Sequence, residues 1–535
     1  MTRVSRPVEG VDVVGAPGTP DQIATATAAR PPGGCALLLG PDDDVAVATM
    51  DLPEGMLVDT AAGTVVSAGV PRGHKIAVRP VAAGAAVRKY GQSIGRATVD
   101  IAPGGHVHTH NLTMDAADRA YEFGTERVVL PGPAVGDRTF LGFHRADGRV
   151  GTRNFVGVLT SVNCSASTAK MIAEQFRGAA LDGHANVDGV VALTHASGCG
   201  LVTGSTGAET LVRTLRGYAR HPNFGGLLVL GLGCEMVPVR SLVDGLDLPA
   251  DTLVEIMTIQ ETGGVRASVR TGVERIRAML PTLNARERTP APISALVLGL
   301  NCGGSDGYSG ITANPALGLA SDQLVAAGGT SILAETPEVF GAEHLLTRRA
   351  VSRAVGQRLL DRIDWWREYA HAGGGSLDNN PSPGNKAGGL TTILEKSLGA
   401  VAKAGRADLT EVYEYAQPVT GPGLVFMDTP GYDPVSVTGI VAGGATVVCF
   451  TTGRGSVLGS RPAPCIKLAT NTELYQHMTE DMDLNCGRIV DGTASLAEVG
   501  QEVLDLIVAV ASGARTASET LDLGRGLQVR TAPLN

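Results

Sequence analysis

Five hydrophobic runs along the chain contain or end in a cysteine and are flanked by small or polar residues. They are FVGVLTSVNC (155–164), GVVALTHASGC (189–199), GLLVLGLGC (226–234), ALVLGLNC (295–302) and ATVVC (445–449). A short apolar run bounded by turn residues is typical of a buried strand, and open α/β sheets build their sites at the carboxyl ends of such strands. Four cysteines share nearly the same context, which predicts one polar pocket able to hold a metal: Cys164, Cys199, Cys234 and Cys302.

Helical patterns alternate with these strands, for example SASTAKMIAEQFRGA (165–179) and GAETLVRTLRGYAR (207–220). This alternation is the pattern of a parallel sheet. Charge and two prolines interrupt it in NARERTPAPI (284–293), which predicts a domain boundary. We therefore expect a first α/β unit over 147–288 and a second over 292–535.

The N-terminal part has a different pattern. Short alternating stretches broken by turn residues, such as VAVATMDL (45–52) and HKIAVRPV (74–81), predict a small β-rich domain over 33–112. Residues 1–32 are rich in Pro, Gly, Ala and Thr without periodicity, which indicates a disordered leader. Residues 113–146 are predicted to be a polar linker. The expected fold class is α/β, with this β domain followed by two units of mostly parallel sheets.

Composition narrows the classes of function. A hydrophobic content of 43% with 18% charged residues indicates a soluble globular protein. A net charge of −9 argues against a nucleic-acid partner, and no apolar run approaches the roughly 18 residues of a membrane helix. The first residues lack the apolar core of a secretory signal, and eight scattered cysteines suit a reducing cytoplasm. The sequence does not set the oligomeric state, so a homo-oligomer remains open.

The chain contains none of the common nucleotide-binding or zinc-protease motifs. It has three long polar loops as candidate sites instead. NCGGSDGYSGITANPALG (301–318) follows a strand, NPSPGNKAGGLTTILEKSLG (380–399) resembles a backbone nest that binds anions, and FTTGRGS (450–456) ends a strand. Their candidate substrate contacts are Ser305, Asp306, Asn314, Gly384, Asn385, Lys386, Gly388 and Arg454. The alternative is that these are glycine-rich connections with a solvated lysine and arginine.

Histidines and carboxylates supply candidate acids, bases and ligands. His195 lies four residues before Cys199, where it is either an acid/base group or a hydrogen-bonded structural residue. The HxHxH pattern would place His106, His108 and His110 on one face of a strand, as a metal or proton-transfer site or as an exposed edge, and His74 could join them. Glu335 and Glu338 follow a further strand as ligands, bases or helix-start carboxylates. Cys35 and Cys465 suggest only packing.

The loops together resemble the altronate/galactarate dehydratase family of sugar-acid lyases. The resemblance extends from about Asp147 to the C-terminus, through DGRVGTRNFVGVLTSVNCSAS, THASGCG, GLGCE, NCGGSDGYSGITANPALG, ETPEVFGAE, NPSPGNKAGGLTTILEKSLG, MDTPGYDP and FTTGRGS. RGHKIAVRPVAAGAAVRKYGQSIGRA and HVHTHN resemble the family's small SAF β-clip domain. The resemblance to this family implies dehydration of a sugar acid to a 2-keto-3-deoxy acid with iron(II) or a similar divalent metal. HVHTHN is closer to the altronate-type members of the family, whereas MDTPGYDP and GSRPAPC depart from them. Galactarate and other hydroxy acids therefore stay possible substrates.

Dehydration requires a base beside the substrate carboxylate and a cation to hold the charge that develops there. We expect Arg454, Lys386 and the amides around Gly384 and Gly388 to bind the carboxylate. We expect His195 to act as the base, and His108 or His110 as the acid. The metal is either one iron(II) bound by imidazole, carboxylate and substrate oxygens, or an iron–sulfur cluster on three of the four cysteines, with iron(II) favoured. The alternative function outside the enzymes is a non-catalytic sensor that binds a sugar acid.

Overall fold

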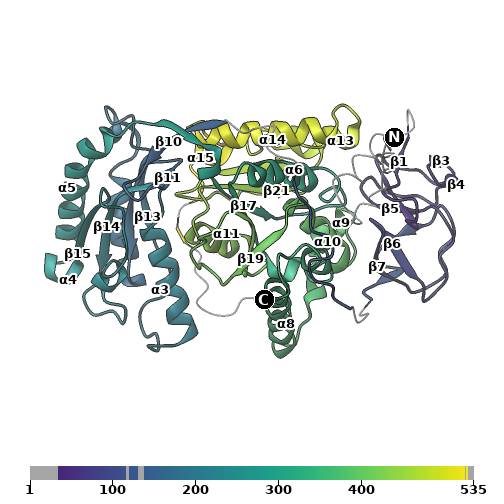
Figure 1. The fold of residues 1–535 in the computed structure, drawn as a ribbon, viewed down its shortest axis with the longest axis horizontal. Coiled ribbons are helices and arrows are strands. Elements are labelled where there is room, and N and C mark those ends of the chain that lie inside the picture. The colour runs from purple at the N-terminus through teal and green to yellow at the C-terminus, as the bar shows by residue number, and fades with distance from the viewer. Residues whose placement is uncertain (1–33, 116–119, 131–137, 525, 528–535) are drawn as a thin grey trace, which may run out of the picture.

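The computed structural model describes residues 34–115, 120–130, 138–524 and 526–527. Three bodies lie side by side in it (Figure 1): a β-rich domain, a central unit built on a seven-stranded sheet, and a unit built on a four-stranded sheet at the opposite end. The expected α/β class with an N-terminal β domain is confirmed. The predicted leader over 1–32 lies outside the described residues.

The β-rich domain consists of short antiparallel strands in three small sheets. One sheet has the order β1-β2-β5-β8: Ala36–Leu37, Val45–Ala48, Lys75–Ala77 and His106–Val107. A hairpin pairs β3 with β4: Leu57–Thr60 and Gly63–Val66. The third has the order β6-β7-β9: Ala86–Lys89, Gln92–Ala97 and Leu112–Thr113.

The first α/β unit has a parallel sheet in the order β13-β12-β14-β15: Gly189–Leu193, Phe155–Thr160, Phe224–Gly231 and Leu253–Thr258. Its helices are α2, α3, α4 and α5: Ala166–Glu174, Thr206–Ala219, Ile259–Thr262 and Val265–Asn284. Ile172 of α2 and Ile276 of α5 share one buried cluster with Leu228, whereas Leu211 of α3 packs with Leu227 on the other face. Helices on both faces explain why β14 is apolar throughout.

The second α/β unit has a parallel sheet in the order β19-β20-β18-β17-β21-β22-β23: Leu409–Tyr413, Gly423–Met427, Thr330–Leu333, Val297–Cys302, Val447–Thr452, Cys465–Ala469 and Leu484–Asn485. Its helices α6 to α10 are Ala313–Ala326, His344–Thr347, Arg353–Ala372, Pro383–Ala387 and Ile393–Val401. Helices α11 to α15 are Asp433–Ala442, Thr472–His477, Arg488–Asp491, Leu496–Ala511 and Ala517–Thr520. Among the described residues, no helix is long and apolar enough to cross a membrane.

A small antiparallel sheet connects the two α/β units where the sequence predicts a linker and a break. Its order is β11-β10-β16: Val150–Gly151, Thr139–His144 and Thr289–Pro292. β16 carries Pro290 and Pro292 and pairs with β10 alone, so it is an edge strand, and proline is tolerated there because one side needs no N–H donor. The two prolines therefore mark an edge strand rather than a gap in the secondary structure.

A buried ion-pair triad joins the β-rich domain to the central unit. Nζ of Lys75 lies 2.8 Å from Oε2 of Glu395, and Nζ of Lys89 lies 2.8 Å from Oε1. Both lysines come from the β-rich domain, Glu395 comes from α10, and all three side chains are essentially inaccessible. Burial lowers the pKa of Lys75 to about 8. Burial alone would raise the pKa of Glu395, but the two ammonium groups hold it well below its usual range.

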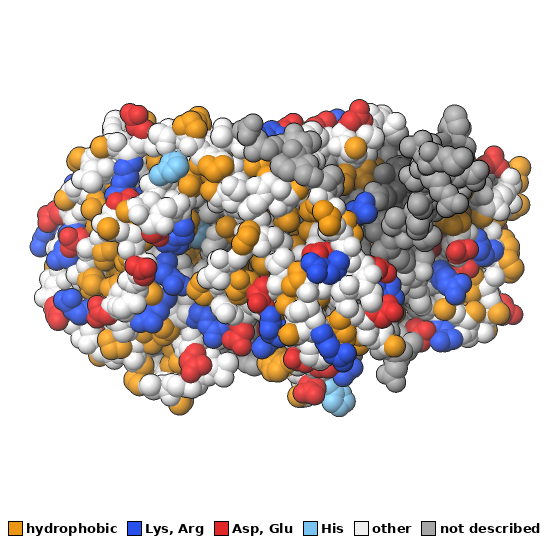
Figure 2. Space-filling view, in the orientation of Figure 1, with side chains coloured by type: hydrophobic (Ala, Val, Ile, Leu, Met, Phe, Trp, Pro, Cys, Tyr) orange, Lys and Arg blue, Asp and Glu red, His pale blue; other side chains and the backbone are white. Residues whose placement is uncertain are grey.

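On the face seen in Figure 2, acidic and basic side chains are interspersed over all three bodies. Exposed pairs of this kind contribute little to stability because water screens them. The Lys75–Glu395–Lys89 triad differs from them because water does not compete for its charges.

We predict that Glu395→Gln lowers the free energy of unfolding by about 3–5 kcal/mol, because two buried ammonium groups lose their counter-charge. Chemical denaturation followed by circular dichroism measures the loss. The matched control is Glu174→Gln, which removes an exposed partner of Arg177 and should cost less than about 1 kcal/mol. Equal losses in the two variants would refute a special role for the triad.

Candidate active site

The carboxyl ends of β17 and β18 bring a thiol and two carboxylates together. Cys302 is the last residue of β17, and Glu335 and Glu338 follow β18, with Glu338 closing a short 3-10 helix (Thr336–Glu338). All three are buried, and ligand atoms from all three lie within 4.8 Å of one another. Oε2 of Glu335 accepts a hydrogen bond from the Cys302 amide at 3.1 Å.

Glu335 adopts a left-handed backbone conformation with φ of 68°. This conformation is rare outside glycine and asparagine, so neighbouring bonds must hold it. The Glu335 amide donates to Oγ1 of Thr429 at 2.8 Å, and that hydroxyl lies 2.8 Å from Oγ of Ser436 on α11. The turn directs the carboxylate of Glu335 back toward Cys302.

Two buried lysines come from α10 and the 3-10 turn that follows it (Ala402–Ala404). Nζ of Lys403 lies 2.8 Å from Sγ of Cys302 and 2.9 Å from Oε2 of Glu335. Nζ of Lys396 lies 2.7 Å from Oε1 of Glu338 and 2.9 Å from Oδ1 of Asn380. Each carboxylate is therefore matched by one ammonium group.

The charges alter the proton affinities in this cluster. Burial, followed by the negative charge of Glu335, raises the pKa of the Cys302 thiol. Burial alone would lower the pKa of Lys403, but the thiol and Glu335 raise it. Burial alone would raise the pKa of Glu338, but Lys396 lowers it. The two lysines thus stay protonated as fixed positive charges.

A cavity of about 350 Å³ opens above the cluster. Its polar lining includes Glu338, Asn380, Ser382, Asn385, Lys396 and Asp433. Burial, together with the negative charges of Glu335 and Glu338, raises the pKa of Asp433 to about 7. Gly303 also lines the cavity, where a Cβ atom would lie 2.1 Å from Oδ2 of Asp433. The volume suits a small polar substrate.

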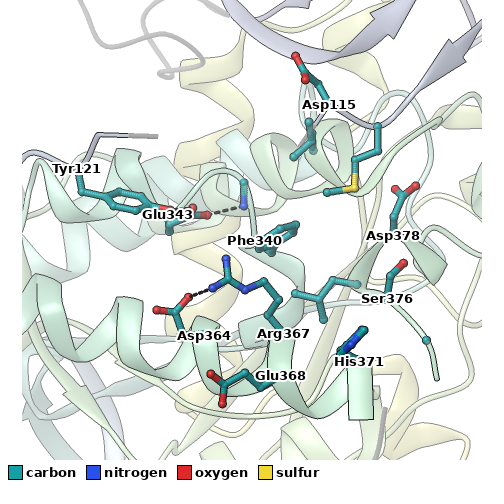
Figure 3. A pocket seen from close by; sticks show the side chains of 15 residues that line it. Asp115, Tyr121, Phe340, Glu343, Asp364, Arg367, Glu368, His371, Ser376 and Asp378 are labelled. Atoms are coloured by element: carbon teal, nitrogen blue, oxygen red, sulfur yellow. Dashed lines mark hydrogen bonds and ion pairs between the residues drawn. The ribbon is translucent and has the colours of Figure 1, made fainter. Parts of the chain in front are cut away.

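A larger cavity of about 690 Å³ adjoins this one and shares Gly375, Ser376 and Leu377 with it (Figure 3). Tyr121 donates to Glu343 at 2.5 Å on one of its sides. Its charged side chains, such as Arg367 and Asp364, are mostly exposed and pair with each other. Glu338 and Lys396 of the buried cluster line the smaller cavity, which is why we place the site there.

The three predicted polar loops meet beside the smaller cavity. The Gly307 amide donates to the Gly388 carbonyl at 2.8 Å, and the Arg454 amide donates to the Gly304 carbonyl at 2.8 Å. Asn385 is buried and lines the cavity, whereas Lys386 and Gly388 are partly exposed and Gly384 and Arg454 are exposed. The loops thus converge, with Asn385 inside and the two predicted cations nearer the surface.

Three other predicted substrate contacts are engaged in the fold. Asp306 accepts hydrogen bonds from Ser309 and Thr470, both at 2.9 Å. The side-chain amide of Asn314 donates to the Gly399 carbonyl at 2.8 Å. Ser305 is buried, and its carbonyl accepts a bond from the Asn385 side chain at 2.8 Å. These bonds hold the loops in position.

His195 lies at the end of β13 in the first α/β unit and does not line the cavity. Its Nε2 lies 3.1 Å from the Thr160 carbonyl, and its Nδ1 accepts from the Ser197 amide at 3.2 Å. Burial lowers its pKa. Both ring nitrogens are thus engaged, one within the loop after β13 and one with the end of β12, which corresponds to the structural alternative.

The histidines of the β-rich domain form a cluster of rings: His74, His106, His108 and His110. β8 ends at Val107, so a turn rather than strand alternation gathers them. Nε2 of His74 lies 3.2 Å from the Ala387 carbonyl, and Nε2 of His108 lies 2.9 Å from the Lys386 carbonyl. The cluster therefore contacts the backbone of the loop whose Asn385 lines the cavity, and its rings are absent from the described cavity lining.

Three segments of the chain match models of one protein family. Residues 293–531 match the family described as D-galactarate/Altronate dehydratase, C-terminal, residues 142–284 match D-galactarate dehydratase/Altronate hydrolase, second domain, and residues 35–115 match the Altronate/galactarate dehydratase SAF domain. Altronate dehydratase of Escherichia coli (strain K12) is 38% identical over 482 residues, which cover 90% of this chain and 96% of that protein. The chain belongs to the altronate/galactarate dehydratase family.

Two further relatives show the range of this dehydratase family. Galactarate dehydratase (L-threo-forming) of E. coli (strain K12) is 38% identical, covering 83% of this chain and 86% of that protein. (2R)-sulfolactate sulfo-lyase subunit beta of Chromohalobacter salexigens is 32% identical, covering 72% of this chain and 95% of that protein. The chain is a carbon–oxygen lyase of the hydro-lyase type, and its relatives support a sugar-acid dehydratase.

The cluster under the cavity of this dehydratase fits a divalent metal. Oε1 of Glu335 is buried and has no hydrogen-bond partner, although burying a bare carboxylate oxygen is costly. One thiol and two carboxylates suit iron(II), which takes sulfur and oxygen ligands. Cys302, Glu335 and Glu338 would hold the ion, and the thiol would lose its proton on binding.

The four predicted metal cysteines are divided between the two sheets. Cys302 is buried at the end of β17, whereas Cys164, Cys199 and Cys234 are exposed and follow strands of the four-stranded sheet. The expectation of one pocket for all four is wrong, because the similar strand ends belong to different sheets. Spacing along the chain gave no information on which sheet each strand joins.

The sequence analysis missed Lys396, Lys403, Asn380 and Asp433. Lys396 and Lys403 lie in the apolar segment ILEKSLGAVAKAG (393–405), and charged residues inside a buried helix are normally paired. That signal was available, whereas Asn380 and Asp433 lie in the motifs NPSPGNK and MDTPGYDP, in which no pattern singles them out. Only the tertiary fold brings them to one cavity.

We predict that the dehydratase binds one cobalt(II) ion at the Cys302 site, seen by thiolate-to-cobalt charge-transfer absorbance under anaerobic conditions. Cys302→Ala should abolish binding of this cobalt(II) ion. Glu335→Gln should weaken it at least about 10-fold, since outer-shell partners alone have that effect. The control is Cys486→Ala, which removes another buried thiol. Unchanged binding in Cys302→Ala would exclude this ligand set.

Proposed function

We propose that this enzyme removes water from an aldonic acid, with altronate as the first substrate to test, and releases a 2-keto-3-deoxy acid. The observation that carries the proposal is a cavity in which the buried ammonium of Lys396 adjoins the carboxylates of Glu338 and Asp433. Relatives named altronate dehydratase at 36–38% identity support the substrate class. The absence of a disulfide among the described residues, in a chain with eight cysteines, fits our further proposal of a cytoplasmic location.

The reaction places negative charge on the substrate carboxylate when the proton on the neighbouring carbon is removed. Lys396 is a permanent cation at the cavity wall, so it can balance that charge without moving. A divalent ion held by Cys302, Glu335 and Glu338 would supply Lewis-acid stabilisation of the charge. The positive charge of Lys403 offsets the negative charge of Glu335 within this group of ligands.

We assign proton transfer to Asp433. It lines the cavity at the first turn of α11, beside Gly303. Its carboxylate takes the proton from the carbon beside the carboxylate and returns it to the hydroxyl that leaves the next carbon. The products are water and an enol, and the enol becomes the 2-keto acid. His195, with His108 or His110 as acid, is the alternative assignment, and Lys386 and Arg454 would then guide the carboxylate from the rim.

The first experiment is anaerobic turnover of a panel of aldonic and aldaric acids with iron(II), with the 2-keto-3-deoxy product as the readout. We expect altronate to be converted. Asp433→Asn should lower kcat by about 10²–10⁴-fold, the usual effect of losing a general acid/base group. His195→Gln is the matched comparison and should keep turnover within about threefold of the parent protein.

Several results would reject these assignments. Normal turnover in Asp433→Asn together with loss of activity in His195→Gln would favour the histidine assignment. Release of sulfite from sulfolactate, with no sugar acid converted, would replace dehydration by the chemistry named for one relative. Binding of a sugar acid without metal-dependent turnover would favour a sensor.

Galactarate is the second candidate substrate, because Arg454 provides a further cation near the rim of the cavity. A Cβ atom on Gly304, which lines the cavity, would lie 3.4 Å from Cβ of Arg454. An aldaric acid has a carboxylate at each end, so it can use both Lys396 and Arg454.

We predict that Arg454→Gln raises KM for galactarate by about 10–100-fold, since a charge-assisted hydrogen bond contributes about 1.5–3 kcal/mol. KM for altronate should change less, because its far end carries a hydroxyl group. Steady-state kinetics on both acids measure the difference. An equal rise for both would mean that Arg454 binds the carboxylate common to the two substrates.

A further inference from the structure

Three of the eight cysteines are exposed, and all three follow strands of the four-stranded sheet: Cys164, Cys199 and Cys234. Of the other five, four are buried and Cys35 is intermediate. Cysteine is among the most buried residue types, so three exposed thiols in one unit are unusual. They are not used by the cavity of the proposed dehydration reaction.

The strand order places the three cysteines side by side at one edge of the sheet. β12 lies between β13 and β14, and the strands end level, with Leu159 opposite Leu193 and Thr160 opposite Leu230. Each cysteine follows the end of its strand by six residues or fewer. All three therefore project from the same carboxyl edge, with Cys164 in the middle.

Hydrogen bonds tie the loop after β13 to the loop after β12. The Asn163 amide donates to the Ser197 carbonyl at 2.8 Å, and Nε2 of His195 lies 3.1 Å from the Thr160 carbonyl. Gly198 has φ of 98°, and a Cβ atom there would lie 2.6 Å from the Ser161 carbonyl oxygen. This close approach fixes the residue next to Cys199 against the loop that carries Cys164.

Glu235 ties the loop after β14 to the same central loop. Its Oε1 accepts from the Ser161 hydroxyl at 2.7 Å, and its Oε2 accepts from the Gly233 amide at 2.6 Å. The Ser165 hydroxyl also donates to the Leu230 carbonyl at 3.1 Å. The residues on both sides of Cys234 are thus held, while its thiol stays exposed.

The Cys164 thiol donates to Oδ1 of Asn163 at 3.6 Å, and this bond would be lost with the thiol proton when a cluster binds. Two neighbouring features favour the thiolate form. Nε2 of Gln260 lies 3.6 Å from Sγ of Cys234 and donates to it. Cys164 immediately precedes Ser165, the N-cap of α2, whose positive dipole end favours negative charge nearby. Hydrogen bonds to sulfur and nearby positive dipoles are the features by which proteins tune bound iron–sulfur clusters.

The three thiols are not placed to bind one metal ion together. A single tetrahedral zinc ion, with Zn–S bonds of about 2.3 Å, requires sulfur atoms about 3.8 Å apart. Within the described residues, the three cysteines do not form a group whose ligand atoms lie within 4.8 Å of one another. A four-iron cluster binds each thiolate at a separate iron, so its sulfur ligands stand farther apart.

We propose that Cys164, Cys199 and Cys234 bind a four-iron, four-sulfur cluster, with the fourth iron open to an external ligand. This site belongs to the four-stranded sheet and is separate from the Cys302 cluster. The proposal does not depend on the proposed substrate. Glu235 and His195 act as positioning residues that hold the loops.

The test is anaerobic reconstitution of the full chain with ferrous iron and sulfide, followed by desalting and measurement of iron, acid-labile sulfide and visible absorbance. We expect about four irons and four sulfides per chain and a broad brown absorbance. Single variants Cys164→Ser, Cys199→Ser and Cys234→Ser should each lose most of the sulfide. These sites are exposed, so the fold should persist, as circular dichroism can verify.

Cys35→Ser and Cys302→Ala are the controls, and both should keep the cluster. Cys302→Ala should nevertheless lose the cobalt site, which separates a failure of this proposal from a failure of the proposed active site. Iron or zinc bound without sulfide would overturn the cluster. So would a cluster that persists in the three serine variants and disappears in Cys302→Ala.

Discussion

Helix α10 and the turn after it place three charged side chains inside the protein, and each requires a counter-charge because it is cut off from water. Glu395 faces the β-rich domain and pairs with Lys75 and Lys89. Lys396, the next residue, faces the cavity and pairs with Glu338. Lys403 lies beneath the cavity against Cys302 and Glu335. This short segment therefore fixes the domain interface and the floor of the candidate site together.

The loop before α10 acquires its position from the same interface. Nζ of Lys75 donates to the Gly389 carbonyl at 2.7 Å, and His74 and His108 contact the carbonyls of Ala387 and Lys386. Asn385 in this loop lines the cavity. The β-rich domain thus shapes the cavity wall through backbone contacts, although its histidines do not face the space inside. The β-rich domain therefore helps to position one wall of the candidate site, although none of its residues is in the described cavity lining.

The two parallel sheets present different chemistry at their carboxyl edges. The seven-stranded sheet buries one thiol among carboxylates and lysines under a small cavity, a setting suited to a hard or intermediate divalent ion. The four-stranded sheet exposes three thiols on loops that are bonded to one another. Similar strand-end sequences therefore lie in two unlike environments, and the sequence alone does not distinguish them.

The sequence by itself determined the α/β class, the N-terminal β domain, the family and the polar loops, because apolar periodicity and contiguous motifs are local properties of the chain. It also identified Cys302, Glu335 and Glu338 as candidate ligands. Only the tertiary structure decided that Cys302 lies apart from the other three cysteines and that His195 is engaged in loop contacts. It alone brought Asn380, Lys396 and Asp433 to one cavity. The reason is physical: strand order and helix facing, which depend on packing across the whole chain, decide which loops meet.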